Sequence, residues 1–329
     1  ERALLFNTNV TAAQARLRQA RALRLLAEAN LAPSVTGGGS AQSSRVEGRE
    51  AGEQYRASLD ATWELDLWGG GAAGLRAAEA GVRASALTLA QVRVSVAAEV
   101  ALTLLQLRGT QARKAIAQRN LASQFQTLRI TQWRQEAGLV TQLDVEQART
   151  AVEQVRAQLP LLAGSSAQAM NALAVLTGRA PGALHVELAP AAGVAVALPA
   201  APTDLVLAIP AAVLRQRPDV LAAEQQLLAA AERVEQADAA RLPSLQLGGS
   251  IGLNALSLGA LGSGAGVASL LASVSMPIFD AGRLQAQVRQ QEAARDEAAA
   301  GYRATVLAAL QEVEDALVAL NATREQLSA

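Results

Sequence analysis

Residues 33–40 read Pro-Ser-Val-Thr-Gly-Gly-Gly-Ser, and residues 243–250 read Pro-Ser-Leu-Gln-Leu-Gly-Gly-Ser. The likeness extends upstream, because residues 10–40 align with residues 220–250 without a gap and twelve of the 31 pairs are identical. Alanine pairs carry little weight in this alanine-rich chain, but the Pro-Ser and Gly-Gly-Ser pairs mark the same event twice: a helix stops and an extended segment begins. This repetition predicts one duplicated architecture rather than two unrelated domains.

The composition favours long helices over compact domains. The chain has 329 residues, enough for two or three ordinary domains, yet aromatic residues make up only 2% of it. Alanine, leucine, valine, glutamine, glutamate and arginine dominate, a mixture typical of long helices packed through small side chains. The formal net charge is zero, with 29 basic and 29 acidic residues. The chain therefore lacks the excess of basic residues that would indicate binding to nucleic acid.

No motif for catalysis, cofactor binding or metal binding stands out in the sequence. Cysteine is absent, which excludes disulfides and thiolate metal sites. The single histidine, His185, lies in a Pro/Ala/Gly-rich stretch and is interpreted as a loop residue, since a metal site needs several converging ligands. Gly69-Gly70-Gly71 lacks the Lys-Ser/Thr of a phosphate-binding loop and is better explained as a strand-to-helix bend. We therefore expect no enzyme and no cofactor.

The first repeat, residues 1–178, is predicted to consist of a helix, a β-hairpin over 34–67 and a long helical hairpin. Pro33 stops the first helix, for which a cap is expected near Thr8 or Asn9. The predicted order is helix 1–31, strand 34–45, charged turn 46–53, strand 54–67, helix 72–136, a tip over 137–145, and a returning helix that runs to Leu176 with Gly178 as its C-cap.

The strand over 54–67 alternates between apolar and polar side chains, so it should have one apolar and one polar face. The polar face carries Arg56, Asp60, Glu64 and Asp66. The apolar face includes Tyr55, Leu59 and Trp63.

The predicted helix over 72–136 would be about 100 Å long at 1.5 Å per residue, more than a compact domain needs. Apolar residues follow it at spacings of three and four typical of coiled coils, and those of the returning helix are spaced 3, 4, 3, 4. Two such helices joined by a short turn predict an antiparallel hairpin. The seam residues are Val92, Val96, Val100, Leu104 and Leu107, and later Leu121, Phe125 and Leu128, on the outgoing helix, and Val145, Ala148, Val152, Val155 and Leu159 on the return.

The second repeat, residues 210–329, follows a linker over 179–209. Residues 242–279 contain no charged side chain, yet seven glycines and a period of two argue against a transmembrane helix. We predict a β-hairpin over 244–278, with Leu247 and Ile251 on its apolar face. A final long helix begins near Gly282 and is cut short at Ala329.

Four strands of this kind cannot close a barrel with a lumen, and an open sheet edge in lipid leaves backbone groups unpaired. Either the strands form a small soluble sheet, or several chains combine their strands into one barrel. Trp63, Trp68 and Phe279 lie at strand ends, where an aromatic belt at a membrane interface would be. The charge-free second hairpin and the connection of hairpins to long helices favour the membrane.

Several short motifs resemble those of one known family and occur in its order along nearly the whole chain. In the first repeat they are Trp63-Glu64-Leu65-Asp66-Leu67-Trp68-Gly69, Gly138-Leu139-Val140 with Leu143-Asp144-Val145, and Leu176-Thr177-Gly178. In the second repeat they are Ile209-Pro210 with Val213-Leu214-Arg215-Gln216-Arg217-Pro218-Asp219-Val220, Ala223-Glu224, Leu242-Pro243-Ser244, Pro277-Ile278-Phe279-Asp280-Ala281-Gly282-Arg283 and Glu312-Val313-Glu314-Asp315-Ala316-Leu317. The family is that of TolC-type outer membrane efflux proteins, in its lipoprotein-type branch.

This resemblance implies a mainly helical homotrimer with a small β part. Each chain would give four strands to a shared twelve-stranded transmembrane β-barrel in outer-membrane lipid, and the helices would form a coiled-coil tunnel through the periplasm of a Gram-negative bacterium. Such proteins are passive exit ducts of tripartite efflux pumps or of type I secretion systems. Their partners are a periplasmic adaptor (membrane fusion) protein and an inner-membrane transporter.

Within this resemblance, the polar strand face would line the lumen, and Leu59, Leu247 and Ile251 would face lipid. The turn from Gly138 to Val145 would be the periplasmic tip, with Gly138, Leu139, Val140 and Asp144 at the gate and the adaptor contact. An aspartate there is also typical of a helix N-cap, and the two roles are compatible.

The chain departs from the family pattern at its ends. A signal sequence, a lipid-bearing cysteine, the start of the first helix and the second hairpin tip are expected to lie outside it. A soluble helical scaffold or adaptor with a small β-sheet is the alternative reading. Such a protein would stay in solution without detergent and would tolerate charges at Leu59, Leu247 and Ile251.

Overall fold

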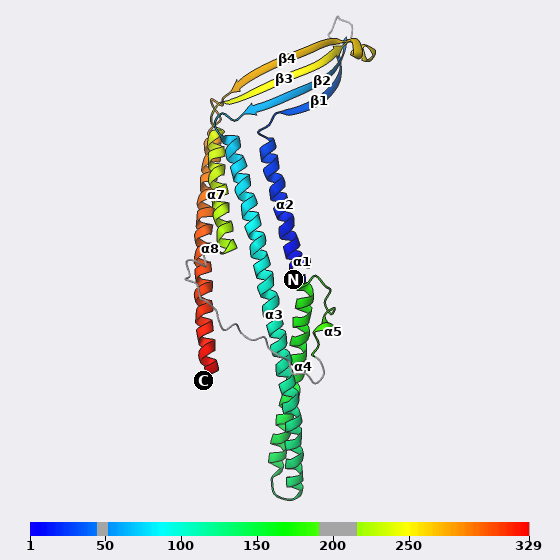
Figure 1. Cartoon of the computed structure of the whole chain (residues 1–329), viewed down its shortest axis with the longest axis vertical. Helices are drawn as coiled ribbons and strands as arrows, with labels where there is room; N and C mark the ends of the chain where they lie inside the picture. Colours follow the sequence, from blue (N-terminus) through cyan, green and yellow to red (C-terminus); the bar gives the residue numbers. More distant parts are fainter. Residues whose placement is uncertain (45–51, 191–215, 329) are drawn as a thin grey trace. The chain divides into compact units, whose positions relative to one another are not determined.

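The computed structural model describes residues 1–44, 52–190 and 216–328 (Figure 1). Most of the predicted charged turn over 46–53 lies outside these residues, and so does most of the predicted linker over 179–209. The chain forms two compact units, Glu1–Gln14 with Leu89–Leu207 and Ala15–Thr88 with Ala208–Ala329. These units do not coincide with the two sequence repeats, because helices α2 (Thr8–Ala29) and α3 (Gly70–Glu136) each have residues in both.

Four strands form one antiparallel sheet whose spatial order is their order in the sequence (Figure 1). A short 3₁₀ helix, η1 (Leu258–Ser263), lies between the last two strands. Each repeat thus contributes one β-hairpin, and the two hairpins pair through the second and third strands. The strands are β1 (Ser34–Ser44), β2 (Gly52–Leu65), β3 (Ser244–Ala255) and β4 (Ala265–Ser275).

The register of the sheet gives it two chemically different faces. Leu59 pairs with Gly37 and Ile251, whereas its neighbour Asp60 pairs with Thr36 and Ser250. Successive strand residues point to opposite faces. In the rows from Tyr55 to Leu65, one face therefore carries only apolar residues and glycine. The opposite face is polar or glycine except at Ala265, Val267 and Leu271 on β4.

Both repeats use an aspartate to turn from strand to helix. The Asp66 carboxylate accepts hydrogen bonds from the backbone N–H groups of Gly71 (3.1 Å) and Ala72 (2.7 Å) at the start of α3. Asp280 accepts from Gly282 (2.9 Å) and from Leu284 (2.8 Å) at the start of α8 (Arg283–Ser328). The bond from the Leu284 N–H lowers the pKa of Asp280 below its ordinary value. These bonds occupy backbone donors that have no partner inside a helix.

The prediction of a strand over 54–67, with Asp66 on its polar face, is wrong at its end. β2 ends at Leu65, and Asp66 belongs to the turn that caps α3. The physical reason is that the free N–H groups of a helix start attract a carboxylate more strongly than a strand position does.

In the unit that holds the sheet, α7 (Pro218–Ala239) runs beside both α8 and the first part of α3. Arg76 pairs with Glu232 (2.8 Å), and Arg83 Nε donates to Gln225 Oε1 (2.7 Å). A Cβ on Gly70 would lie only 2.8 Å from the Ala239 Cβ. The glycine run therefore allows α3 and α7 to approach closely.

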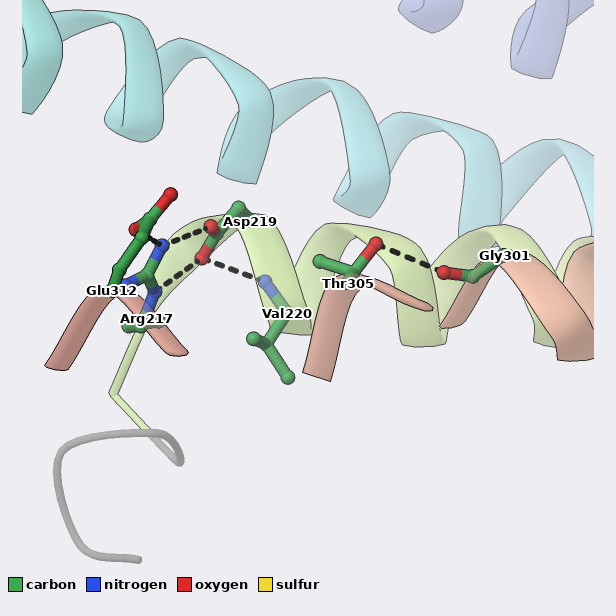
Figure 2. Close-up of polar contacts among 6 residues, drawn as sticks. All are labelled: Arg217, Asp219, Val220, Gly301, Thr305 and Glu312. Carbon is green, nitrogen blue, oxygen red and sulfur yellow. Dashed lines mark hydrogen bonds and ion pairs between the residues drawn. The ribbon is translucent and has the colours of Figure 1, made fainter. Parts of the chain in front are cut away.

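The start of α7 is held by an ion-pair cluster (Figure 2). Arg217 binds both oxygens of Asp219, at 3.1 and 2.6 Å, and its Nη2 also lies 2.7 Å from Glu312 Oε2 on α8. The hydrogen bonds from Arg217 lower the pKa of Asp219, and those to Asp219 raise the pKa of Arg217. The Arg-Pro-Asp motif thus fixes the helix start against its neighbour.

The other unit opens with a break in the predicted helix over 1–31. The helix α1 (Arg2–Phe6) ends at Asn7, whose backbone is extended. The buried Asn7 side chain donates to the Leu176 carbonyl oxygen (3.0 Å), and its Oδ1 accepts from the Asn9 N–H (2.8 Å). Asn7, rather than Thr8 or Asn9, therefore caps α2, because this amide also binds the end of α4 (Gln142–Leu176).

The predicted seam between α3 and α4 is present in part, because Val96 and Leu107 on α3 are buried, whereas the predicted seam residue Phe125 is 40% exposed. Val145 and Val152 are buried on α4, and Arg156 on α4 lies over the Phe125 ring of α3, 5.3 Å from its centroid. Further along, Leu107 of α3 is enclosed by α4 and by a short segment before α5 (His185–Leu188). The residues that enclose it are Ala169, Leu173, Ala174 and Leu184.

Candidate functional site

The tip of the α3–α4 hairpin is a five-residue turn between Glu136 and Gln142. Gly138 has a φ of +74°, a left-handed conformation that glycine adopts without strain. The N–H of Leu139 donates to the Arg134 carbonyl oxygen (2.8 Å), which turns the chain back. Leu139 is 70% exposed and Val140 is half-buried. The turn thus presents a large apolar side chain to its surroundings.

Asp144 and Thr141 form a reciprocal cap at the start of α4. Asp144 Oδ2 accepts from the Thr141 backbone N–H (2.8 Å) and from its hydroxyl (2.6 Å). Thr141 Oγ1 accepts in turn from the Asp144 N–H (3.4 Å). The hydrogen bond from the Thr141 hydroxyl, followed by the one from its N–H, lowers the pKa of Asp144. Thr141 is therefore the N-cap and Asp144 the third helical residue, a capping box.

On the polar face of the sheet, β2 and β3 share a network of hydrogen bonds. Arg56 Nη2 donates to Ser250 Oγ (3.1 Å), and Ser250 is the register partner of Asp60. Asp60 Oδ2 accepts from the Ser58 hydroxyl (2.8 Å). The alternation of each strand puts all four residues on polar faces, but the bond from Arg56 to Ser250 was not predictable, because the two residues lie 194 positions apart in the chain.

The remaining predicted polar residues, Glu64 and Asp66, lie at the helix end of β2. They line a hollow of about 460 Å³ together with Asn30, Trp68 and Gln236. Asp66 caps α3, as described above. Within the described residues, Glu64 has no ion-pair partner.

On the apolar face, Leu59 is 55% and Ile251 63% exposed in the single chain. Leu247, Tyr55 and Trp63 are half-buried, whereas Phe279 beyond β4 is almost fully exposed. Leu59 and Ile251 also border a shallow hollow of about 780 Å³, which exists because glycines such as Gly37 and Gly266 leave no side chain there.

Trp63 and Trp68 hold the two equivalent helix-to-strand turns. Trp63 Nε1 donates to the Leu31 carbonyl oxygen at the end of the first repeat's helix (2.9 Å). Trp68 Nε1 donates to the Pro243 carbonyl oxygen at the corresponding place in the second repeat (2.7 Å). The sequence placed both residues at strand ends, but these bonds over 32 and 175 residues were not predictable from it.

Among the described residues, no group of three His, Asp or Glu side chains is arranged to hold a metal ion. His185 Nε2 lies 3.0 Å from Asn171 Oδ1 in a partly buried contact. The chemistry of these surfaces is therefore that of charge, hydrogen bonding and apolar contact.

Comparison with known proteins identifies the family. The family described as "Outer membrane efflux protein" matches residues 1–179 and 209–329. The chain belongs to this family. It is 34% identical over 328 residues to the pyoverdine export outer membrane protein OpmQ of Pseudomonas putida, a match that covers 96% of this chain and 68% of that protein. It is 35% identical over 287 residues to the toluene efflux pump outer membrane protein TtgF of Pseudomonas putida, covering 85% of this chain and 58% of that protein.

Solved structures agree with this outer membrane efflux family. The chain superposes on the outer-membrane channel OprN with a TM-score of 0.93 at 35% identity, covering 100% of this chain and 74% of that chain. For the outer membrane protein VceC of Vibrio cholerae the TM-score is 0.90 at 26% identity, covering 100% and 79%. This efflux protein is the outer-membrane channel of an efflux pump in a Gram-negative bacterium, and its family is not one of enzymes.

Two helices of this efflux protein, α3 and α4, are long and apolar enough to cross a membrane by length and composition. Those two properties also describe a helix that packs against other helices. Leu107 on α3 is buried against α4, and Val145 and Val152, which are seven positions apart on α4, are also buried, so helices pack together at these positions.

Proposed function

We propose that three copies of this chain form one channel, in which twelve strands close a shared transmembrane β-barrel. The observation that carries this proposal is the strand order β1-β2-β3-β4, which gives β1 and β4 one neighbour each among the residues that the structure describes. An open edge in lipid leaves N–H and C=O groups unpaired, at several kcal/mol each. Pairing β4 of one copy with β1 of the next is antiparallel and removes every edge.

The two faces of the sheet support the same arrangement. Lipid would meet the face that carries Leu59, Leu247 and Ile251, and water would fill the side of Arg56, Asp60 and Glu64. Tyr55, Trp63, Trp68 and Phe279 lie toward the two ends of the strands, where aromatic residues suit the membrane interfaces. Asp66 would stand at the water-filled end of the wall, as a helix cap rather than a strand residue.

Beyond the membrane, the helices would form a coiled-coil tunnel through the periplasm. Large apolar residues on α3 and α4 are exposed in the single chain, among them Leu102, Ile130 and Leu161. Neighbouring copies would cover these faces, since helices in a coiled coil bury their apolar stripes against each other.

The hairpin tip at Gly138, Leu139, Val140 and Asp144 would be the gate and the contact for a periplasmic adaptor that joins the channel to an inner-membrane transporter. Both hydrogen bonds from Thr141 use Asp144 Oδ2. Asp144 Oδ1 accepts no hydrogen bond from any residue that the structure describes, so it can accept one from a neighbouring helix in the trimer. In the full-length protein, Asp144→Ala should raise single-channel conductance in planar bilayers. Unchanged conductance would remove the gate role.

We further propose small organic molecules as the cargo, because similar chains serve in pyoverdine export and toluene efflux. A protein-secretion duct of type I is the alternative. A lipid anchor on the full-length protein, as in the lipoprotein-type branch, also stays a prediction.

Disulfide trapping tests the closed barrel, and the absence of cysteine from this chain keeps the background low. Thr36→Cys on β1 is combined in turn with Ser269→Cys, Leu271→Cys or Ser273→Cys on β4 in the full-length protein. Oxidation in outer membranes should yield covalent dimers and trimers for at least one combination.

The matched control is Ser34→Cys with Thr62→Cys, whose hydroxyls lie 2.8 Å apart within one chain. This pair should form its disulfide and still migrate as a monomer. If the control pair closes while every β1–β4 combination gives only monomer, the shared barrel is wrong.

A further inference from the structure

The two repeats meet inside the chain at a junction where the sheet joins the helices. The exit of the first repeat lies against the helix-to-strand turn of the second, because Trp68 Nε1 donates to the Pro243 carbonyl oxygen (2.7 Å). Two residues further along, a Cβ on Gly70 would lie 2.8 Å from the Cβ of Ala239. The exit of one repeat therefore covers the turn of the repeat that follows it.

The equivalent turn of the first repeat is more exposed. Ala29 and Pro33 stand 210 positions before Ala239 and Pro243, as identical pairs in the alignment of the repeats. Ala29 and Pro33 are exposed, whereas Ala239 and Pro243 are half-buried. Among the residues that the structure describes, the same turn is thus covered in the second repeat and open in the first.

The exit of the second repeat presents two large apolar side chains between β4 and α8. Ile278 is 97% and Phe279 is 90% exposed. The two exits share a backbone feature, since Gly69 (φ +75°) and Gly282 (φ +83°) each directly precede a long helix. Trp68 lies one residue before its glycine, and Phe279 lies three residues before its own. Both exits therefore carry an aromatic ring close to the helix start.

We propose that Ile278 and Phe279 of each copy cover the turn at residues 31–33 of the next copy and fasten the chains where the sheet joins the helices. This inference rests on the proposed trimer, in which β4 of one copy pairs with β1 of the next. That pairing brings the second repeat's exit to the next copy's first turn. Pairing of β2 with β3 brings Trp68 to Pro243 within one chain in the same way. The occupant of the open turn is therefore a second copy of this chain.

The junction between copies differs in its chemistry from the junction within the chain. Trp68 offers an indole N–H to a carbonyl oxygen, whereas isoleucine and phenylalanine have no side-chain donor. The contact between copies therefore depends on the burial of apolar surface. Adjacent exposed apolar side chains are typical of a contact surface, and aromatic residues are enriched at the centre of such surfaces.

Cysteine cross-linking in the full-length protein tests this contact with both apolar residues left in place. Ala32→Cys is combined in turn with Pro277→Cys or Ala281→Cys, which flank them. Outer membranes are treated with a short bifunctional maleimide. Each thiolate adds to one maleimide double bond, and the neighbouring carbon takes up a proton. At least one combination should give covalent dimers and trimers. The control pair within one chain, Ser34→Cys with Thr62→Cys, should link and still migrate as a monomer.

A second measurement removes the aromatic ring itself. Phe279→Ala should lower the temperature at which the detergent-extracted trimer separates into single chains, because the junction between each pair of copies loses a ring. Gel electrophoresis after stepwise heating measures the dissociation. Leu256→Ala removes an 81% exposed side chain just after β3, at the other end of the sheet, and should leave that temperature unchanged.

The outcomes separate this contact from the barrel on which it rests. Assembled trimers that give no link between copies, while the control pair links, would overturn the inference and leave the shared barrel intact. An unchanged dissociation temperature in Phe279→Ala would also overturn it. If Phe279→Ala lowers the amount of inserted protein without altering dissociation, the segment meets lipid instead of a neighbouring copy. Unsubstituted protein that is monomeric in native mass spectrometry would contradict the barrel, and this contact with it.

Discussion

The helical hairpin and the sheet of this chain differ in how much of their apolar surface is buried within a single chain. In the hairpin region, Leu107 is 0% and Val152 1% exposed, because α3 and α4 bury their seam within one chain. On the apolar face of the sheet, Leu59 is 55% and Leu270 88% exposed. The comparison indicates which part of the fold one chain completes alone and which part needs lipid and other copies.

Backbone hydrogen bonding shows the same difference. A helix satisfies its N–H and C=O groups within itself, apart from its ends. Asp66 caps the start of α3, and Thr141 and Asp144 cap the start of α4. A sheet satisfies its groups only through neighbouring strands, and within residues 1–44, 52–190 and 216–328 β1 and β4 each pair on one side only. Membrane insertion and assembly should therefore depend on the sheet, and the stability of a single chain on the hairpin.

The largest effect on stability is expected from a substitution in the buried seam of the α3–α4 hairpin. Leu107→Ala removes a fully buried side chain and should lower the free energy of unfolding by about 2–5 kcal/mol, from lost apolar contact and a residual cavity. Denaturant unfolding followed by circular dichroism measures it. Leu102→Ala, an exposed position five residues earlier, is the control and should cost much less in the monomer.

A charge on the apolar face of the sheet sharpens the comparison, because its cost should appear only in the membrane. Leu59→Arg and Leu247→Arg should each cost about 2–4 kcal/mol near the bilayer midplane. Fractionation of outer membranes measures the loss of inserted protein. Thr62→Arg, on the polar face of the same strand, should insert normally. Normal insertion of both leucine variants would show that this face does not meet lipid.

The turn between sheet and helix should show a smaller effect. Asp66→Ala leaves the Gly71 and Ala72 N–H groups without their carboxylate and should cost about 1 kcal/mol, the usual value of a helix cap. Thermal unfolding of the full-length protein measures it. Glu64→Ala is a nearby control that removes a carboxylate with no capping role, and equal losses in the two variants would contradict the assignment.

The smallest effect is a pH dependence at the hairpin tip. The pKa of Asp144 is lowered in the folded protein, so its contribution to stability is present above the unfolded-state pKa and is lost as pH falls through the lowered folded-state value. Hydrogen exchange of the Thr141 amide, which donates to Asp144, should therefore reveal greater opening in that acidic window. Asp144→Asn should weaken protection and remove its pH dependence, and a dependence that persists would place its origin elsewhere.

Features that follow from a regular spacing of apolar residues along one segment could be predicted from the sequence. The alternation from Tyr55 to Leu65 predicts the two faces of β2, and the 3-4 spacing predicts Val145 and Val152 as seam residues, both of which are buried. Asp66 continued the alternation and was assigned to the strand, although it caps a helix. A period cannot distinguish these roles, because the cap depends on where the next helix starts in space.

Contacts between distant segments were beyond sequence reasoning for the same physical cause. The break at Asn7 exists because its amide reaches the Leu176 carbonyl oxygen, 169 residues away. The link from Arg56 to Ser250 exists because the two repeats pair their hairpins in one sheet. Neither is encoded in a local pattern, and each required the register or the packing of the folded chain.

The number of chains in the membrane-extracted channel tests the central claim most directly. Native mass spectrometry of the full-length protein, released from detergent micelles, should give three times the mass of one chain. A stable species of one chain that keeps the sheet folded and needs no detergent would contradict the shared barrel.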